Sequence, residues 1–155
     1  MNVIGFNFTK VFAEKSSEFK PASSTNMNIE FTGVKKEEIN VFKDIEAINI
    51  TFRFFVAYTD AKEKKPQKEQ PKEGEVILEG NILLSATKEE AKDILKSWKK
   101  KELPPSFNVP LFNLILKKCS TKALQLEEEL NLPSHIPLPQ LRPQSSQKSS
   151  EESKS

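Results

Sequence analysis

Hydrophobic and polar residues alternate along four stretches of the chain, which is the pattern of half-buried β-strands. The clearest stretch, residues 48–58, places one set of large side chains on a single face: Ile48, Ile50, Phe52, Phe54, Val56 and Tyr58. The same period of two predicts strands at residues 4–12, 27–33 and 76–84. In the first of these, the buried face is assigned to Ile4, Phe6, Phe8 and Phe12.

The segment between the last two strands, residues 61–74, combines lysine, glutamate and two prolines without an apolar anchor. We expect a solvated loop there. Antiparallel pairing of the strands on either side of this loop is the simplest connection.

After the fourth strand, the apolar spacing changes to that of a helix. Thr87 and Glu90 make a T-x-x-E capping box, in which each side chain bonds the backbone amide of the other residue. Apolar residues then recur at helical spacing as far as Trp98, and Pro104 ends the pattern. A short amphipathic helix is therefore predicted between Thr87 and Pro104.

A second, longer helix is predicted at about residues 109–130. Ser106 or Asn108 is expected to cap it, with Pro110 tolerated in its first turn. Asn131 should stop it. Its apolar stripe consists of Phe112, Ile115, Leu116, Cys119, Ala123, Leu126 and Leu130.

The segment from Leu130 to Leu141, LNLPSHIPLPQL, is here named the Pro–Leu ribbon. Its three prolines exclude both a helix and a central strand, because proline fixes φ and lacks a backbone donor. An extended apolar segment of this kind must lie on something. It either covers the core of its own subunit or helps to build a surface that other apolar segments use.

Residues 143–155 are polar and are predicted to be a disordered tail, which leaves residues 1–142 as a single domain. Strands followed by helices imply an α+β fold, with a four-stranded antiparallel sheet and two helices on one face. Some apolar residues, such as Phe55 and Ile77, fall on the opposite face. A second subunit could cover them, or they could be scattered surface residues, and the sequence leaves both open.

Composition narrows the class of protein. Lys and Arg total 24 against 22 Asp and Glu, and this near balance does not predict a nucleic-acid partner. Only two of the cations are arginine, the side chain best suited to phosphate. A single cysteine excludes an intrachain disulfide and favours a reducing compartment. The sequence shows neither a signal peptide nor an apolar run long enough to span a membrane, so a cytoplasmic protein is expected.

Few side chains offer catalytic chemistry. Cys119 lies on the apolar stripe and is interpreted as a buried small hydrophobe. His135, the only histidine, is interpreted as a surface or packing residue. Glu127, Glu128 and Glu129 are interpreted as a solvated helix face, because successive helix positions do not face each other. We therefore expect no enzyme activity, no catalytic residues, no metal and no cofactor.

The order of elements resembles the SecB-type protein-export chaperones and their archaeal and toxin–antitoxin relatives. VIGFNFTKVFAEKSSEF is similar to the family's opening strand, and AINITFRFFVAYTD and EVILEGNILLSA resemble its central strands. The most specific likeness is NVPLFNLILKKCSTKALQLEEELNLPSHIPLPQL, which is similar to the family's long helix and the extended Pro- and Leu-rich loop after it. The resemblance covers residues 3–141.

This resemblance implies a SecB-like fold that assembles as dimers or dimers of dimers and binds unfolded polypeptides in apolar grooves. Bacterial members have a further C-terminal helix, where this chain has PQSSQKSSEESKS. Carried over by position, the polypeptide-binding residues are Leu130, Leu132, Pro133, Ile136, Leu138 and Leu141, with Phe112, Ile115 and Leu116 on the helix.

Two functions follow as hypotheses. The first is an ATP-independent holdase chaperone that binds unfolded or nascent polypeptides. The alternative is a structural or scaffold subunit of a larger assembly, such as a ribosome-associated one, that binds no client. In the first, the Pro–Leu ribbon is a groove wall; in the second, it only seals its own core.

Overall fold

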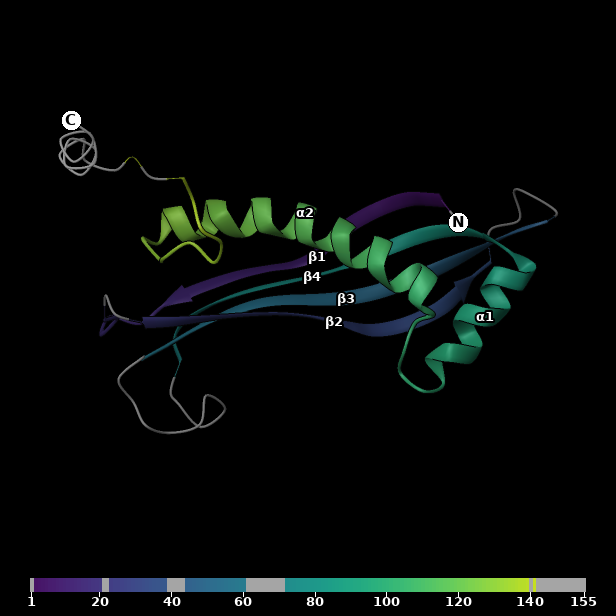
Figure 1. The fold of residues 1–155 in the computed structure, drawn as a ribbon, viewed down its shortest axis with the longest axis horizontal. Coiled ribbons are helices and arrows are strands. Elements are labelled where there is room, and N and C mark those ends of the chain that lie inside the picture. The colour runs from purple at the N-terminus through teal and green to yellow at the C-terminus, as the bar shows by residue number, and fades with distance from the viewer. Residues whose placement is uncertain (1, 21–22, 39–43, 61–71, 140, 142–155) are drawn as a thin grey trace, which may run out of the picture.

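A computed structural model describes residues 2–20, 23–38, 44–60, 72–139 and 141. Four antiparallel strands form one sheet in the order β1-β4-β3-β2, and two helices follow them in the chain (Figure 1). The elements are β1 (Asn2–Lys15), β2 (Ser23–Glu37), β3 (Ile45–Asp60), β4 (Lys72–Thr87), α1 (Lys88–Trp98) and α2 (Pro105–Glu129). The predicted α+β class and the antiparallel pairing of β3 with β4 are confirmed.

The core lies between the sheet and the two helices, which cover the same face. The alternating residues predicted for β3 are all buried, and they contact the matching face of β4 and the helices. α2 runs along the sheet and α1 lies near one end of it (Figure 1). Among the described residues, no helix has an apolar stretch long enough to cross a membrane. The opposite sheet face, away from the helices, is named the outer face below.

A β-bulge changes the predicted faces of β1. The register shifts between Phe8 and Lys10, so that one extra residue is inserted there. Such an insertion moves every later side chain to the other face, because side chains alternate with a period of two. Val11 is therefore paired with Leu78 of the core face, and Phe12 with Ile77 of the outer face. The assignment of Phe12 to the buried face was wrong, and so was that of Ile4, which is 55% exposed and lies at a second register shift between Val3 and Gly5.

The strands are longer than their hydrophobic patterns predicted. β2 continues to Glu37, and β4 begins at Lys72, within the segment predicted as a loop. Ladder hydrogen bonds to a neighbouring strand hold these polar ends in place without an apolar pattern. The rest of the predicted loop, residues 61–71, and the predicted tail, residues 143–155, lie outside the described residues.

The capping box of α1 is present. The Thr87 hydroxyl accepts from the Glu90 amide at 3.2 Å, and the Glu90 carboxylate accepts from the Thr87 amide at 3.1 Å. The hydrogen bond from the Thr87 backbone lowers the pKa of the Glu90 carboxyl. The predicted start of this helix is confirmed to the residue.

The start of α2 was predicted wrongly. The helix begins at Pro105, with Pro104 as its N-cap and without a side-chain cap, so neither Ser106 nor Asn108 caps it. The amide of Phe107 donates to the Pro104 carbonyl at 2.9 Å, and the Phe107 side chain is buried in the core. Packing of this first turn thus replaces a polar cap. The predicted stop is confirmed at Asn131, which adopts a positive φ of 53°.

Gly80 of β4 has the β1 backbone directly beside it and tests the bulged register. An alanine Cβ at this position would collide with the Asn7 carbonyl and lie 2.9 Å from Cζ of Phe52. Gly80→Ala should lower the free energy of unfolding by about 2 kcal/mol, because the strands must separate. Chemical denaturation measures this.

Gly5→Ala is the matched control, since its Cβ would meet Leu83 at an ordinary 3.5 Å. Equal effects of the two substitutions would contradict the register described here.

Candidate functional site

The Pro–Leu ribbon divides into a buried half and an exposed half. Leu132 is 7% exposed and belongs to the core, against which Leu130 also packs. Pro133 and Ile136 are half-buried. By contrast, Leu138 is 54% exposed and Leu141 is fully exposed. The first half therefore seals the subunit, and only the second half presents apolar side chains to solvent.

Glu127, near the end of α2, holds the buried half in place. Its side chain is almost wholly inaccessible, at 1% exposure for the residue. The backbone amide of His135 donates to its Oε2 at 3.0 Å, and Nδ1 of the His135 ring lies 2.6 Å from its Oε1. The interpretation of Glu127 as part of a solvated face was wrong, whereas Glu128 and Glu129 are exposed.

Tyr58 of β3 joins this group from the sheet. Its hydroxyl lies 2.7 Å from Oε2 of Glu127 and 2.7 Å from the carbonyl oxygen of Pro133. The single hydroxyl proton serves one of these acceptors at a time. Burial, and then the adjacent Glu127 carboxylate, raise the pKa of Tyr58, so the phenol stays protonated. We name Tyr58, Glu127 and His135 the ribbon clamp.

The His135 ring is enclosed on both sides. Its side chain has no exposed surface, its Nε2 lies 3.3 Å from the Ser120 hydroxyl, and its ring meets Phe54 edge-on with centroids 5.7 Å apart. His135 is therefore not a surface residue. Its two ring nitrogens and its backbone amide all engage α2, which fixes the position of the ribbon at this residue.

The His135 ring lies between the Ser120 hydroxyl and the Glu127 carboxylate, as the histidine of a serine hydrolase triad does. The surroundings, however, do not suit acyl transfer. Ser120 lies in the middle of α2, where backbone amides donate to carbonyls four residues back. Those amides are not available to stabilise an oxyanion, which triad enzymes require. The buried ring of His135 also leaves no room beside it for a substrate. The arrangement is better suited to holding the ribbon.

A sequence signal for Glu127 does exist. Every fourth residue along α2 is buried, in a row that consists of Phe107, Leu111, Ile115, Cys119, Ala123 and Glu127. Residues four apart form a ridge along one side of a helix, so extending the row identifies Glu127 as a buried carboxylate. Tyr58 likewise ends the apolar face of β3, where a buried hydroxyl requires a partner. Neither signal identifies His135 as the link between them.

The predicted helix residues lie in different environments. Ile115 is on the side of α2 that faces the core, and it is fully buried. Phe112 and Leu116 are half-buried and pack against the rim of the core. Cys119 is buried as predicted, and burial raises the pKa of its thiol to about 12, so it is not a nucleophile at neutral pH.

Phe112 also lines a pocket that we name the β2 groove. This pocket has a volume of about 580 Å³ and lies between edge strand β2, the segment joining the two helices and the first turns of α2. The rings of Phe31 and Phe112 meet there edge-on, with centroids 5.3 Å apart. Asn108 adds a buried Oδ1 with no hydrogen-bond partner among the described residues. The groove is lined by Ile29, Glu30, Phe31, Lys101, Glu102, Leu103, Pro105, Asn108 and Phe112.

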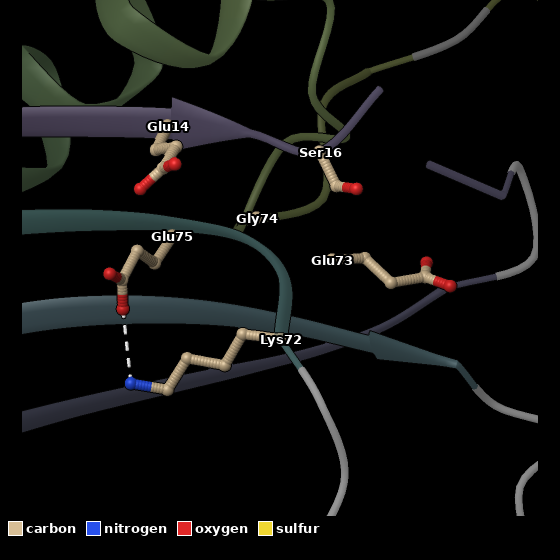
Figure 2. Close-up of a pocket in the computed structure, with 6 residues that line it drawn as sticks. All are labelled: Glu14, Ser16, Lys72, Glu73, Gly74 and Glu75. Carbon is tan, nitrogen blue, oxygen red and sulfur yellow. Dashed lines mark hydrogen bonds and ion pairs between the residues drawn. The ribbon is translucent and has the colours of Figure 1, made fainter. Parts of the chain in front are cut away.

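A second pocket, of about 260 Å³, is acidic and lies where β1 meets the start of β4 (Figure 2). Glu75 is paired with Lys72 at 3.0 Å, and the Glu73 carboxylate points away from Glu14 and Glu75 (Figure 2). Over the described part of the chain, no group of three or more acidic, histidine or cysteine side chains is placed to hold a metal ion.

Comparison with known proteins gives one structural likeness to report. Neither the scan against protein-family models nor the search of curated proteins finds a match. Among solved structures, the chain is similar to the Mycobacterium tuberculosis Rv1957 SecB-like chaperone, solved in complex with a ChAD peptide from the Rv1956 HigA1 antitoxin. The identity is 13%, the alignment covers 92% of this chain and 91% of that chain, and the TM-score is 0.48.

The ribbon clamp predicts unequal roles for neighbouring glutamates. Glu127→Gln should lower the free energy of unfolding by about 2–4 kcal/mol, because it removes the buried carboxylate that accepts from the His135 amide and contacts the Tyr58 hydroxyl and His135 Nδ1. Glu128→Gln, one residue along and exposed, should change it by less than about 0.5 kcal/mol. Urea denaturation of both variants gives the comparison. Similar values for the two would show that Glu127 is not a structural centre.

The raised pKa of Tyr58 predicts a loss of stability in alkali. The folded state holds the phenol proton more tightly than the unfolded state, whose tyrosine titrates at about pH 10. The contribution of Tyr58 is therefore complete below that pH and is lost as the pH rises above it. Tyr58 is the only tyrosine, so tyrosinate absorbance reports it alone. The absorbance should rise only as the protein unfolds.

Tyr58→Phe should remove the corresponding part of the pH dependence. Titration of the folded protein near pH 10 would contradict the buried hydrogen bond.

Proposed function

We propose that this protein is an ATP-independent polypeptide-binding chaperone of the holdase type, acting in the cytoplasm as a homo-oligomer. Its proposed clients are unfolded or nascent polypeptides, and the proposal includes neither enzymatic activity nor a cofactor. The observation that carries the proposal is the β2 groove beside an edge strand, in which Phe31, Leu103 and Phe112 lie among the polar residues Glu30, Lys101, Glu102 and Asn108. The resemblance of the sequence to SecB-type chaperones also supports it.

An edge strand beside a pocket that combines aromatic and polar side chains suits an extended peptide. The strand order leaves the outward side of β2 without a strand partner among the described residues. A client segment that adds to this edge gains main-chain hydrogen bonds, and its alternate side chains enter the pocket beside Phe31 and Phe112. The Ile29 amide donates to the Asn28 side chain at 2.9 Å, so strand addition there exchanges one hydrogen bond for another.

The exposed half of the Pro–Leu ribbon provides a second apolar contact. The ribbon begins at Leu130, the C-cap of α2, about 27 Å from Phe112, given a rise of 1.5 Å per residue. An extended client of about eight residues spans that length. β2 connects the two regions, since Thr25 pairs with Tyr58 near the ribbon and Phe31 lines the groove. Several weak contacts along one client would then act together.

The scaffold alternative keeps one observation in its favour. Leu132 is buried and the ribbon clamp is closed, so the first half of the ribbon behaves as a lid on its own core. That observation favours a sealing role for residues 130–136. It does not extend to Leu138 and Leu141, whose exposed side chains cover no core residue in the described part of the chain.

Light scattering of a denatured model client tests the proposal. The wild-type protein should suppress aggregation without ATP, and no suppression at stoichiometric excess would reject the proposal. Leu138→Ser should weaken suppression while changing the free energy of unfolding by less than about 0.5 kcal/mol, because the side chain is largely exposed. Ile4→Ser is the matched control, with similar exposure on β1 at the other edge of the sheet.

The double variant Ile136→Ser with Leu138→Ser separates the two hypotheses. A folded double variant with weakened client binding supports the groove. The sealing role is supported if the double variant unfolds while Leu138→Ser alone keeps both the wild-type stability and the wild-type suppression of aggregation.

A further inference from the structure

The outer face of the sheet carries an ordered pattern rather than scattered residues. The bulge in β1 brings Phe12 beside Ile77 of β4, which in turn pairs with Phe55 of β3. These three side chains and Asn28 of β2 form one row across the sheet, named the aromatic row. Ile77 is only 7% exposed, because its neighbours enclose it, although neither α1 nor α2 covers this face.

The next row across the outer face is charged and alternates in sign. Lys10, Glu79, Arg53 and Glu30 lie side by side on β1, β4, β3 and β2, and this set is named the charged row. The Arg53 guanidinium lies 3.8 Å from both Glu30 and Glu79, beyond hydrogen-bond distance. Its Nε is buried and has no hydrogen-bond partner among the described residues. Asn81, one row further, likewise has a buried, unpartnered Oδ1.

We propose that the outer face binds the outer face of a second copy of this chain, through a two-fold axis parallel to the strands. This axis reverses the order of the strands, so that β4 of one subunit faces β3 of the other, and β1 faces β2. Arg53 then faces Glu79 of the second copy, and Lys10 faces Glu30. Ile77 faces Phe55 in the aromatic row. Every cation of the charged row meets an anion.

The charged row disfavours one other two-fold arrangement. An axis perpendicular to the strands and passing through the charged row would place Arg53 against Arg53 and Glu79 against Glu79. Like charges brought together in this way oppose association strongly. With the axis parallel to the strands, the alternation of signs is self-complementary, which is the requirement for an isologous interface.

The size of the face is sufficient for a stable interface. Strands lie about 4.8 Å apart and same-face residues about 6.8 Å apart, so four strands by about six rows present roughly 800 Å². A standard protein interface buries about 800 Å² on each partner. Two sheets packed face to face in this way also match the common aligned packing of β-sheets.

Reciprocal charge reversal tests this interface. Arg53→Glu and Glu79→Arg should each weaken self-association at least about tenfold, because each places like charges together across the interface. An equimolar mixture of the two variants should restore association, since each new charge then meets its opposite on the partner. Sedimentation or light-scattering mass against concentration measures all three samples. Restoration by mixing cannot arise from a defect within one subunit.

Lys92→Glu makes the same change of charge on the exposed surface of α1 and should leave the mass unchanged. Three results would overturn the proposal: a monomeric wild-type protein at high concentration, single variants with the wild-type mass, or a mixture that stays dissociated. Circular dichroism and urea denaturation of each single variant establish that it is folded before the masses are compared.

Discussion

The hydrogen bonds of one buried carboxylate, Glu127 of α2, determine how the Pro–Leu ribbon packs against the helix and the sheet. Glu127 accepts hydrogen bonds from the ribbon backbone and lies against the His135 ring and the Tyr58 hydroxyl. A buried charge without partners is strongly unfavourable, so helix, sheet and ribbon must meet in one arrangement or leave the carboxylate unsatisfied. Hydrophobic contacts of Leu132 would tolerate several positions of the ribbon. The hydrogen bonds of the ribbon clamp select one of them.

Because the ribbon clamp fixes only the first part of the Pro–Leu ribbon, the two halves of the ribbon have different roles. Residues up to Ile136 are committed to the subunit's own core, which leaves Leu138 and Leu141 as its exposed apolar side chains. The β2 groove, at the other end of α2, adds Phe31 and Phe112 to the apolar surface on the helical side. The outer face of the sheet is chemically distinct, because the charged row places cations and anions alternately across its four strands. The two faces of one sheet thus offer different kinds of contact.

Much of the fold could be predicted because its signals are local. The alternation in β3 and the capping box of α1 each act within a few residues, and both were predicted correctly. The bulge before Lys10 could not be predicted from the sequence, because it depends on how β1 pairs with β4 rather than on β1 alone. Glu127 was predicted to be solvated because it is charged and has charged neighbours, although its position continues the row of buried residues along α2. The ribbon was recognised as a unit, but the boundary between its halves depends on a clamp assembled from three distant segments.

The clamp also has a consequence for synthesis on the ribosome. The chain emerges from its N-terminus, so all four strands are made before Glu127 and Pro133 exist to accept a hydrogen bond from Tyr58. Until then the sheet exposes its apolar face and cannot bury the Tyr58 hydroxyl with a partner. A sheet in this state has exposed apolar surface and edge strands, which make folding intermediates prone to aggregation. Completion of the ribbon is therefore the last step in covering this face of the sheet.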